Sequence, residues 1–115
     1  MLDVGPEWRV GNIGRIATIL DSELNDLDRA VAYYQDILAT APEHENARTS
    51  LMEALRRLER WADLVQGLYD AAPYQSEGER LESRFEIATI YREHLDNLDA
   101  ALDALESVLV EDNES

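Results

Sequence analysis

The chain has 115 residues, a length typical of one small domain, and its 45% hydrophobic and 30% charged residues favour a folded protein over a disordered one. Ten basic residues, all of them arginine, stand against 25 acidic ones. The resulting net charge of -15 disfavours nucleic acids and anionic membranes as partners, because both attract positive surfaces. The absence of cysteine excludes disulfides, thiolate metal sites and cysteine nucleophiles.

Hydrophobic residues recur at helical spacing along the chain. The pattern predicts six helices, at residues 7–23, 27–40, 45–58, 61–71, 77–94 and 98–110. Asn-Asp at residues 25–26 and Asp-Asn at residues 96–97 separate the first and the last pair of helices, because these residue types favour turns and helix N-caps. Ser76 and Glu79 have the spacing of a capping box before the fifth helix. We therefore expect an all-α fold.

The chain also contains an internal repeat. Residues 16–38 align with residues 87–109 at an offset of 71, and nine of the 23 aligned positions are identical. An offset of this length is too long for one helical hairpin and suits two, which predicts a more degenerate unit between the copies. Residues 51–72 take that place, at offsets of 35 and 36 from the two copies. Three helical hairpins are therefore expected.

Several positions of the hairpins carry the residue types of a known repeat. In the first unit they are Ile13, Ile16-Ala17, Leu20, Ala30, Tyr34 and Pro42. In the third unit they are Ile87-Ala88, Tyr91, Ala101 and Leu105, and the poorer middle unit has Leu51-Met52, Leu55, Leu64 and Leu68. This pattern resembles the tetratricopeptide repeat. The resemblance implies a right-handed α-α superhelix of three helical hairpins, with a lead-in and three repeats at residues 1–10, 11–44, 45–76 and 77–115.

The resemblance also implies roles in packing. Small residues are expected where the two helices of a hairpin approach closely, at Ala17, Ala30, Ala88 and Ala101. Tyr34 and Tyr91 are expected to fill the space between hairpins, and Tyr33 is expected to be the more exposed of the two adjacent tyrosines. The pentatricopeptide repeat has a similar period, but that family reads single-stranded RNA, which the negative charge disfavours.

Proteins of the tetratricopeptide kind bind peptides or protein segments on the concave face of the superhelix, which the first helix of each hairpin lines. The resemblance places twelve residues of this chain on that face: Gly14, Thr18, Asp21, Ser22, Thr49, Glu53, Arg56, Arg57, Phe85, Thr89, Arg92 and Glu93. Arg56, Arg57 and Arg92 would anchor an acidic group or a C-terminal carboxylate, because arginine binds carboxylates bidentately. Alternatively, these arginines are ordinary surface residues that pair with neighbouring acids.

Motifs for catalysis or for cofactors are missing from the sequence. His44 and His94 stand alone, and neither has the spacing of a metal site, so we expect no enzymatic activity, no cofactor and no metal. The first residues do not form a signal peptide, and no run of about 18 apolar residues occurs, so a cytoplasmic location without membrane insertion is expected. The favoured function is a scaffold for protein-protein interaction, whose partner is a protein or peptide and not a nucleic acid.

The third repeat is expected to lack a C-terminal capping helix. Its apolar residues Leu102, Leu105 and Val108 would then be partly bare. One explanation is that the chain is a fragment of a longer repeat protein. The alternative function is a structural spacer or a homo-oligomerisation segment, which forms a homodimer through its uncapped C-terminal hairpin.

Overall fold

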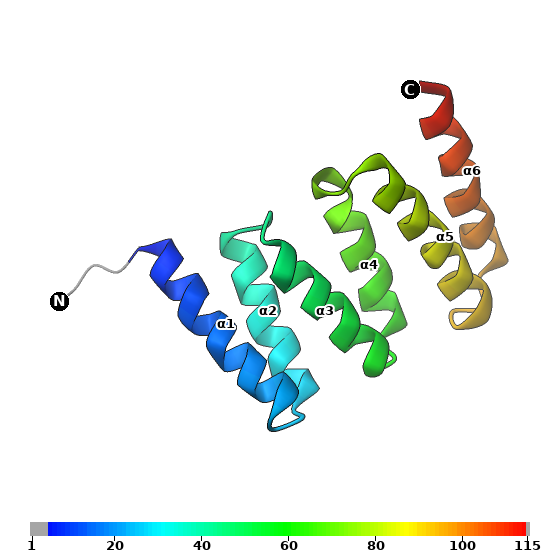
Figure 1. Cartoon of the computed structure of the whole chain (residues 1–115). Helices are drawn as coiled ribbons and strands as arrows, with labels where there is room; N and C mark the ends of the chain where they lie inside the picture. Colours follow the sequence, from blue (N-terminus) through cyan, green and yellow to red (C-terminus); the bar gives the residue numbers. More distant parts are fainter. Residues whose placement is uncertain (1–4, 115) are drawn as a thin grey trace. The chain divides into compact units, whose positions relative to one another are not determined.

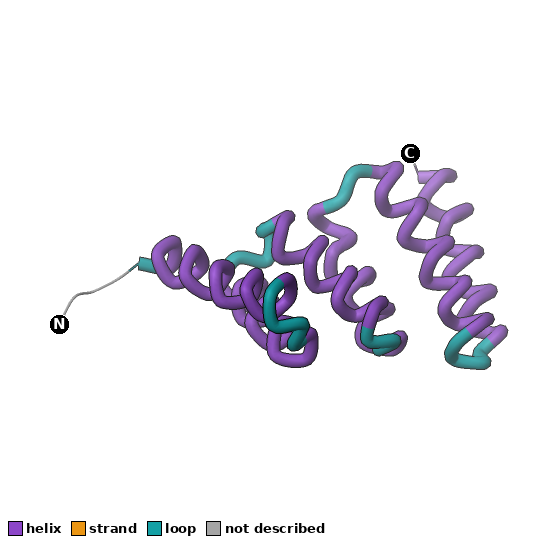
Figure 2. The backbone as a smooth tube through the Cα atoms, turned by 60° about the horizontal axis from the view of Figure 1, so that its bottom comes forward, coloured by secondary structure: helices purple, strands orange, loops and turns teal. Residues whose placement is uncertain are grey.

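The computed structural model of the chain describes the backbone of residues 5–114 and the side chains of residues 5–110. Within that range it contains six α-helices, one short 3-10 helix and no β-strand (Figures 1 and 2). The helices are α1 (Pro6–Ser22), α2 (Leu27–Thr40), α3 (Glu45–Arg57), α4 (Trp61–Ala71), η1 (Ala72–Tyr74), α5 (Glu77–Glu93) and α6 (Leu98–Glu114). The expected all-α fold is confirmed, and each predicted α-helix starts within one residue of the observed one. The 3-10 helix and the extension of α6 to Glu114 were not predicted.

The turns that follow α1, α3 and α5 share one backbone feature. Each contains a residue in the left-handed region, with φ of 50° at Asn25, 56° at Glu59 and 49° at Asp96. Asparagine and aspartate tolerate this conformation better than most residues, whereas glutamate gains nothing from it. Asn25 and Asp96 are aligned by the offset of 71, so the first and third hairpins turn in the same way.

Side chains cap four of the helices: Asp26 before α2, His44 before α3, Ser76 before α5 and Asn97 before α6. Asp26 before α2 and Asn97 before α6 each accept a hydrogen bond from the backbone N–H three residues later, at 3.3 and 3.0 Å. Before α5, the Ser76 hydroxyl accepts a hydrogen bond from the Glu79 N–H, and the Glu79 carboxylate accepts one from the Ser76 N–H, both at 3.2 Å. The predicted capping box is therefore confirmed.

The chain divides into two compact units, Met1–Arg60 (unit 1) and Trp61–Ser115 (unit 2). Unit 1 holds α1 to α3 and unit 2 holds α4 to α6. The border between the units lies inside the range 45–76 that the sequence assigns to the second repeat.

In unit 1, α1 and α3 both pack against α2. Ala17 of α1 and Ala30 of α2 have no exposed surface, which agrees with their expected place at a close approach of the two helices. Tyr34 is buried and Tyr33 is only half-buried, as expected. Ile16, one of the hydrophobic positions of the repeat pattern, is 44% exposed and lies outside the core.

In unit 2, α5 packs against both α4 and α6. The core side chains are Leu64, Val65, Leu68, Ala71, Ile87, Ala88, Ile90, Ala101 and Ala104. At the start of α4, the Trp61 ring stacks on the His94 ring, with centroids 3.9 Å apart and planes 11° apart. Leu102 and Leu105 are exposed and Val108 is half-buried, which agrees with the expectation that they are partly bare. None of the described helices combines the length and the hydropathy that a bilayer span requires.

Candidate functional site

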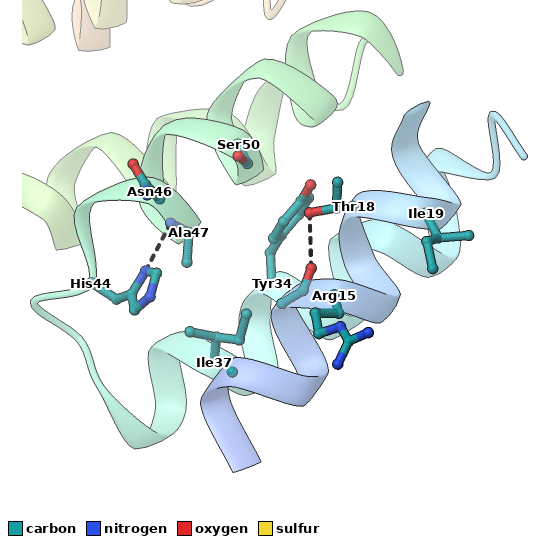
Figure 3. Close-up of a pocket in the computed structure, with 11 residues that line it drawn as sticks. Arg15, Thr18, Ile19, Tyr34, Ile37, His44, Asn46, Ala47 and Ser50 are labelled. Carbon is teal, nitrogen blue, oxygen red and sulfur yellow. Dashed lines mark hydrogen bonds between the residues drawn. The ribbon is translucent and has the colours of Figure 1, made fainter. Parts of the chain in front are cut away.

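An open hollow of about 460 Å³ lies between the three helices of unit 1 (Figure 3). Its lining residues are Gly11, Gly14, Arg15, Thr18 and Ile19 of α1, Tyr34 and Ile37 of α2, and His44, Asn46, Ala47 and Ser50 at the start of α3. Figure 3 shows the α1 residues on one side, the α3 residues on the other, and Tyr34 and Ile37 between them. The hollow is therefore a feature of the tertiary fold of unit 1.

Two glycines of α1 border this hollow. A methyl group added at Gly14 would make an ordinary contact of 3.9 Å with Cδ1 of Ile37, and one added at Gly11 would meet no atom within 4 Å. Helix packing therefore requires neither glycine, although a glycine inside a helix costs about 0.5–1 kcal/mol relative to alanine. Both glycines line the hollow without placing a side chain in it.

Tyr34 contributes a neutral phenol to the wall of the hollow. Its hydroxyl donates a hydrogen bond of 3.1 Å to the Asp21 carboxylate. Burial raises the pKa of Tyr34, and the hydrogen bond and negative charge of Asp21 raise it further, while a hydrogen bond from Ser50 opposes them. The phenol therefore keeps its proton at physiological pH.

This raised pKa predicts how stability depends on alkaline pH. The neutral phenol is favoured in the folded state, so its contribution is complete below about pH 10, the pKa of an unfolded tyrosine, and is lost as pH rises through the folded-state pKa. Above about pH 10 the free energy of unfolding should fall less steeply with pH for Tyr34→Phe than for wild type. Urea denaturation at a series of pH values measures this. Tyr33→Phe controls for the loss of a tyrosine hydroxyl. Parallel curves for wild type and Tyr34→Phe would contradict the prediction.

His44 is held by the start of α3. Its Nδ1 accepts a hydrogen bond of 3.1 Å from the Ala47 N–H and so caps the helix (Figure 3). In the neutral imidazole the proton must then be on Nε2, which leaves that nitrogen as a donor at the edge of the hollow. On the opposite side the Thr18 hydroxyl donates to the Gly14 carbonyl at 2.9 Å and is left as an acceptor.

The charge of the lining differs from that of the whole chain. None of the eleven lining residues is acidic, although the chain has 25 acidic residues. Arg15 is exposed, and its side chain forms no ion pair or hydrogen bond with any residue that the structure describes. The hollow thus combines one available positive charge with apolar walls, an arrangement suited to a ligand that carries a carboxylate.

Of the twelve residues predicted for the concave face, Gly14 and Thr18 line the hollow. The predicted residues near the end of α1 and of α3 interact with one another instead. Arg57 donates to Asp21 and to Asn25, both at 3.2 Å, and Ser22 donates to the Thr18 carbonyl at 2.7 Å. The Asp21 carboxylate therefore joins α1, α2 and α3, because it also accepts the Tyr34 hydrogen bond.

The other predicted arginines also lie in ion pairs. Arg56 pairs with Glu53 at 3.7 Å, one turn away on α3, and Thr49 is exposed on the same helix. On α5 in unit 2, Arg92 pairs with Glu93 at 3.2 Å. Pairs as exposed as these contribute at most about 1 kcal/mol.

The α5 set shares one exposed face of that helix. Phe85, Thr89, Arg92 and Glu93 are all exposed, and the Thr89 hydroxyl donates to the Phe85 carbonyl at 3.0 Å. All four are predicted groove residues, and they lie in a different unit from the hollow.

The sequence interpretation missed most of the lining of the hollow. Arg15, Ile19 and Ser50 lie beside the positions that the resemblance selects, and His44 and Asn46 lie at the start of α3. The signal that would have found the hollow is the pair Gly11 and Gly14 inside a predicted helix, because glycines there are unfavourable unless they serve packing or a site.

No protein-family model, no curated protein and no solved structure matches this chain. Among the described residues, no group of three or more histidine, aspartate or glutamate side chains is arranged to hold a metal ion.

Proposed function

We propose that this chain is a protein-binding module that holds a peptide segment in the hollow of unit 1. The observation that carries the proposal is the contrast between an acidic chain and a hollow without acidic lining, in which Arg15 has no partner among the described residues. Binding sites for ligands are concave, mostly apolar and supplied with a few polar groups that fix orientation. Ile19, which is 46% exposed, is the large aliphatic side chain that this lining presents to a ligand, and Arg15 and His44 offer hydrogen-bond donors.

We also propose that the three hairpins are tetratricopeptide-like repeats that stack into a right-handed superhelix. The recurrence of one left-handed residue after α1, α3 and α5 supports three units of similar construction. The buried alanines at aligned positions support it as well, since Ala17 matches Ala88 and Ala30 matches Ala101.

The ligand that fits this hollow is a short peptide with an aliphatic residue and a carboxylate. Arg15 offers the planar guanidinium that binds a carboxylate bidentately, and the exposed Ile19 offers apolar contact. The Asp21 carboxylate lies 3.1 Å from the hydroxyl of the lining residue Tyr34, but it also pairs with Arg57 at 3.2 Å. Exposed charges farther than about 8 Å away are largely screened at physiological ionic strength.

A substitution that fills the hollow tests the proposal. Gly11→Leu adds a bulky group where an added Cβ meets no atom within 4 Å, so the fold is kept while the space for a ligand shrinks. Peptides are selected from a random library displayed on phage against the immobilised chain, and their Kd values are measured by fluorescence anisotropy. We expect the selected peptides to bind Gly11→Leu at least tenfold more weakly than wild type.

Gly78→Leu is the matched control, because Gly78 is also helical and an added Cβ there also meets no atom within 4 Å. The control should bind like wild type. Arg15→Gln should weaken binding by about tenfold, since hydrogen bonds to charged groups contribute about 1.5–3 kcal/mol. Equal affinities of Gly11→Leu and Gly78→Leu, or selected peptides that contain no essential carboxylate, would contradict the proposed site.

A further inference from the structure

Helix α6 buries its small side chains and exposes its large ones. Ala101 and Ala104 are buried against the rest of unit 2, whereas Leu98, Leu102, Leu105 and Leu109 are exposed. We call these four leucines the α6 stripe; the exposed fractions of its last three members are 54%, 38% and 64%. A row of exposed leucines on a helix whose buried face consists of alanines is unfavourable in water. Such a row marks an interaction surface.

The internal repeat shows what kind of structure would cover the stripe. The offset of 71 aligns Leu102 with Val31, Leu105 with Tyr34 and Leu109 with Leu38 of α2. Val31 is only 1% exposed and Tyr34 only 5%, and α3 packs against α2 in that unit. The α6 stripe therefore corresponds to the surface of α2 that meets another helix.

The spacing of the stripe points to the same occupant. Its members follow each other at intervals of four, three and four residues, which is the a/d spacing of a helix that packs along a second helix. From Leu98 to Leu109 the stripe extends over about 16 Å, or three helical turns. One amphipathic helix of similar length would cover it.

Charge around the stripe selects among such helices. Asp99, Asp103 and Glu106 of α6 are exposed, and their side chains form no ion pair with any described residue. Asp99 aligns with Asp28 of α2, whose carboxylate lies 3.9 Å from the guanidinium of Arg60 just after α3. At the positions of Asp103 and Glu106, α2 has the uncharged Ala32 and Gln35, so the α6 surface carries two more negative charges there than α2 and favours a basic partner.

The same charges disfavour a second copy of this chain. Residues 61–115 hold 14 of the 25 acidic residues and only three of the ten arginines, and none of those arginines lies on α6. A symmetric dimer through α6 would place the two acidic surfaces against each other, because both copies use the same patch.

We propose that the α6 stripe docks a basic amphipathic helix of a partner protein, with an apolar row against the four leucines and an arginine or lysine against Asp99. This second binding surface is independent of the hollow in unit 1. Helix α3 is the example of such a ligand within the chain, since it carries Leu51 and Leu55 together with Arg48, Arg56 and Arg57.

The experiment uses the full chain and a synthetic peptide of residues 44–60. A hydrocarbon staple between positions 45 and 49, which are exposed on α3, holds the peptide helical and reduces the entropy lost on binding. Two comparison peptides are used. The first has glutamate in place of all four arginines, and the second has glutamine in place of Leu51 and Leu55. Fluorescence anisotropy should show saturable binding of the first peptide alone, with affinity that falls between 50 and 200 mM salt.

Variants of the chain locate the binding. Leu102→Gln/Leu109→Gln should weaken the basic peptide at least tenfold, and Asp99→Asn should weaken it about threefold. Ile16→Gln/Leu24→Gln is the matched control, because it replaces two exposed aliphatic residues in unit 1 that lie outside the hollow. The control should bind like wild type.

Three outcomes would overturn the proposal. One is the absence of saturable binding by the basic peptide, and another is equal binding of the charge-reversed peptide or of the Leu102→Gln/Leu109→Gln chain. The third is a dimer that forms as the concentration rises, as measured by analytical ultracentrifugation, and that is lost in Leu102→Gln/Leu109→Gln. Such a result would show that the α6 stripe binds a second copy of this chain.

Discussion

Replacing Ile87 with alanine should lower the free energy of unfolding of unit 2 by about 2–5 kcal/mol. Ile87 has no exposed surface and is among the largest fully buried side chains of the chain, on the helix that contacts both α4 and α6. Truncation removes apolar contact and leaves a cavity that the surrounding helices fill only partly. Urea denaturation followed by circular dichroism at 222 nm measures the change.

Leu102→Ala is the control for this prediction. It removes apolar carbons of similar number, but from a side chain that is 54% exposed on α6, so we expect a loss of no more than about 1 kcal/mol. A loss as large as that of Ile87→Ala would show that the α6 stripe is covered in the isolated chain. In that case it would not be an available docking surface.

The positions of the helices could be predicted because their signals are local. The 3.6-residue period, the capping box at Ser76 and the turn residues at Asn25 and Asp96 each act within a few residues. Burial could not be predicted in the same way. The sequence Ile-Ala-Thr-Ile occurs at residues 16–19 and again at residues 87–90. Its first residue is 44% exposed at Ile16 and 0% exposed at Ile87.

The difference between these two isoleucines comes from their neighbours in space. Helix α5 has α4 packed against it in its own unit, and Ile87 is buried there. A single-helix pattern reports that one face is apolar, but it does not report whether another helix covers that face.

The candidate site was harder to predict for a related reason. The sequence left two hypotheses open for Arg57, an anchor for a ligand or a surface residue that pairs with an acid, and in the structure it pairs with Asp21, a residue 36 positions away in the sequence. The choice among many acidic partners depends on how α1 and α3 pack against α2. Gly11 and Gly14 line the hollow without filling it, and the periodicity of hydrophobic residues does not reveal where a side chain is missing.

The two proposed surfaces prefer ligands of opposite charge. The hollow has Arg15 and no acidic lining, whereas the α6 stripe is flanked by Asp99, Asp103 and Glu106. Electrostatic complementarity acts mainly on specificity and on the rate of association. A single partner with a basic helix and a short segment that ends in a carboxylate would satisfy both surfaces, and the variants described above separate their contributions.

Replacing Ala30 with leucine should destabilise unit 1 by about 1–3 kcal/mol. Ala30 of α2 and Ala17 of α1 have no exposed surface, and the two helices pack against each other, so an isobutyl group has no space there. The helices must separate or the side chain must adopt a strained rotamer, and either response weakens the contacts around it. The measurement is again urea denaturation followed by circular dichroism.

Ala32→Leu is the matched control, because Ala32 is exposed on the same helix and the substitution adds the same atoms. Leucine and alanine are both good helix formers, so the control should stay within about 0.5 kcal/mol of wild type. The peptides selected for the hollow provide a second readout. Because α1 and α2 both line the hollow, separation of these helices should weaken peptide binding to Ala30→Leu and leave Ala32→Leu unchanged. Equal stability of the two variants would show that α1 and α2 do not need the small residue at position 30 for their contact.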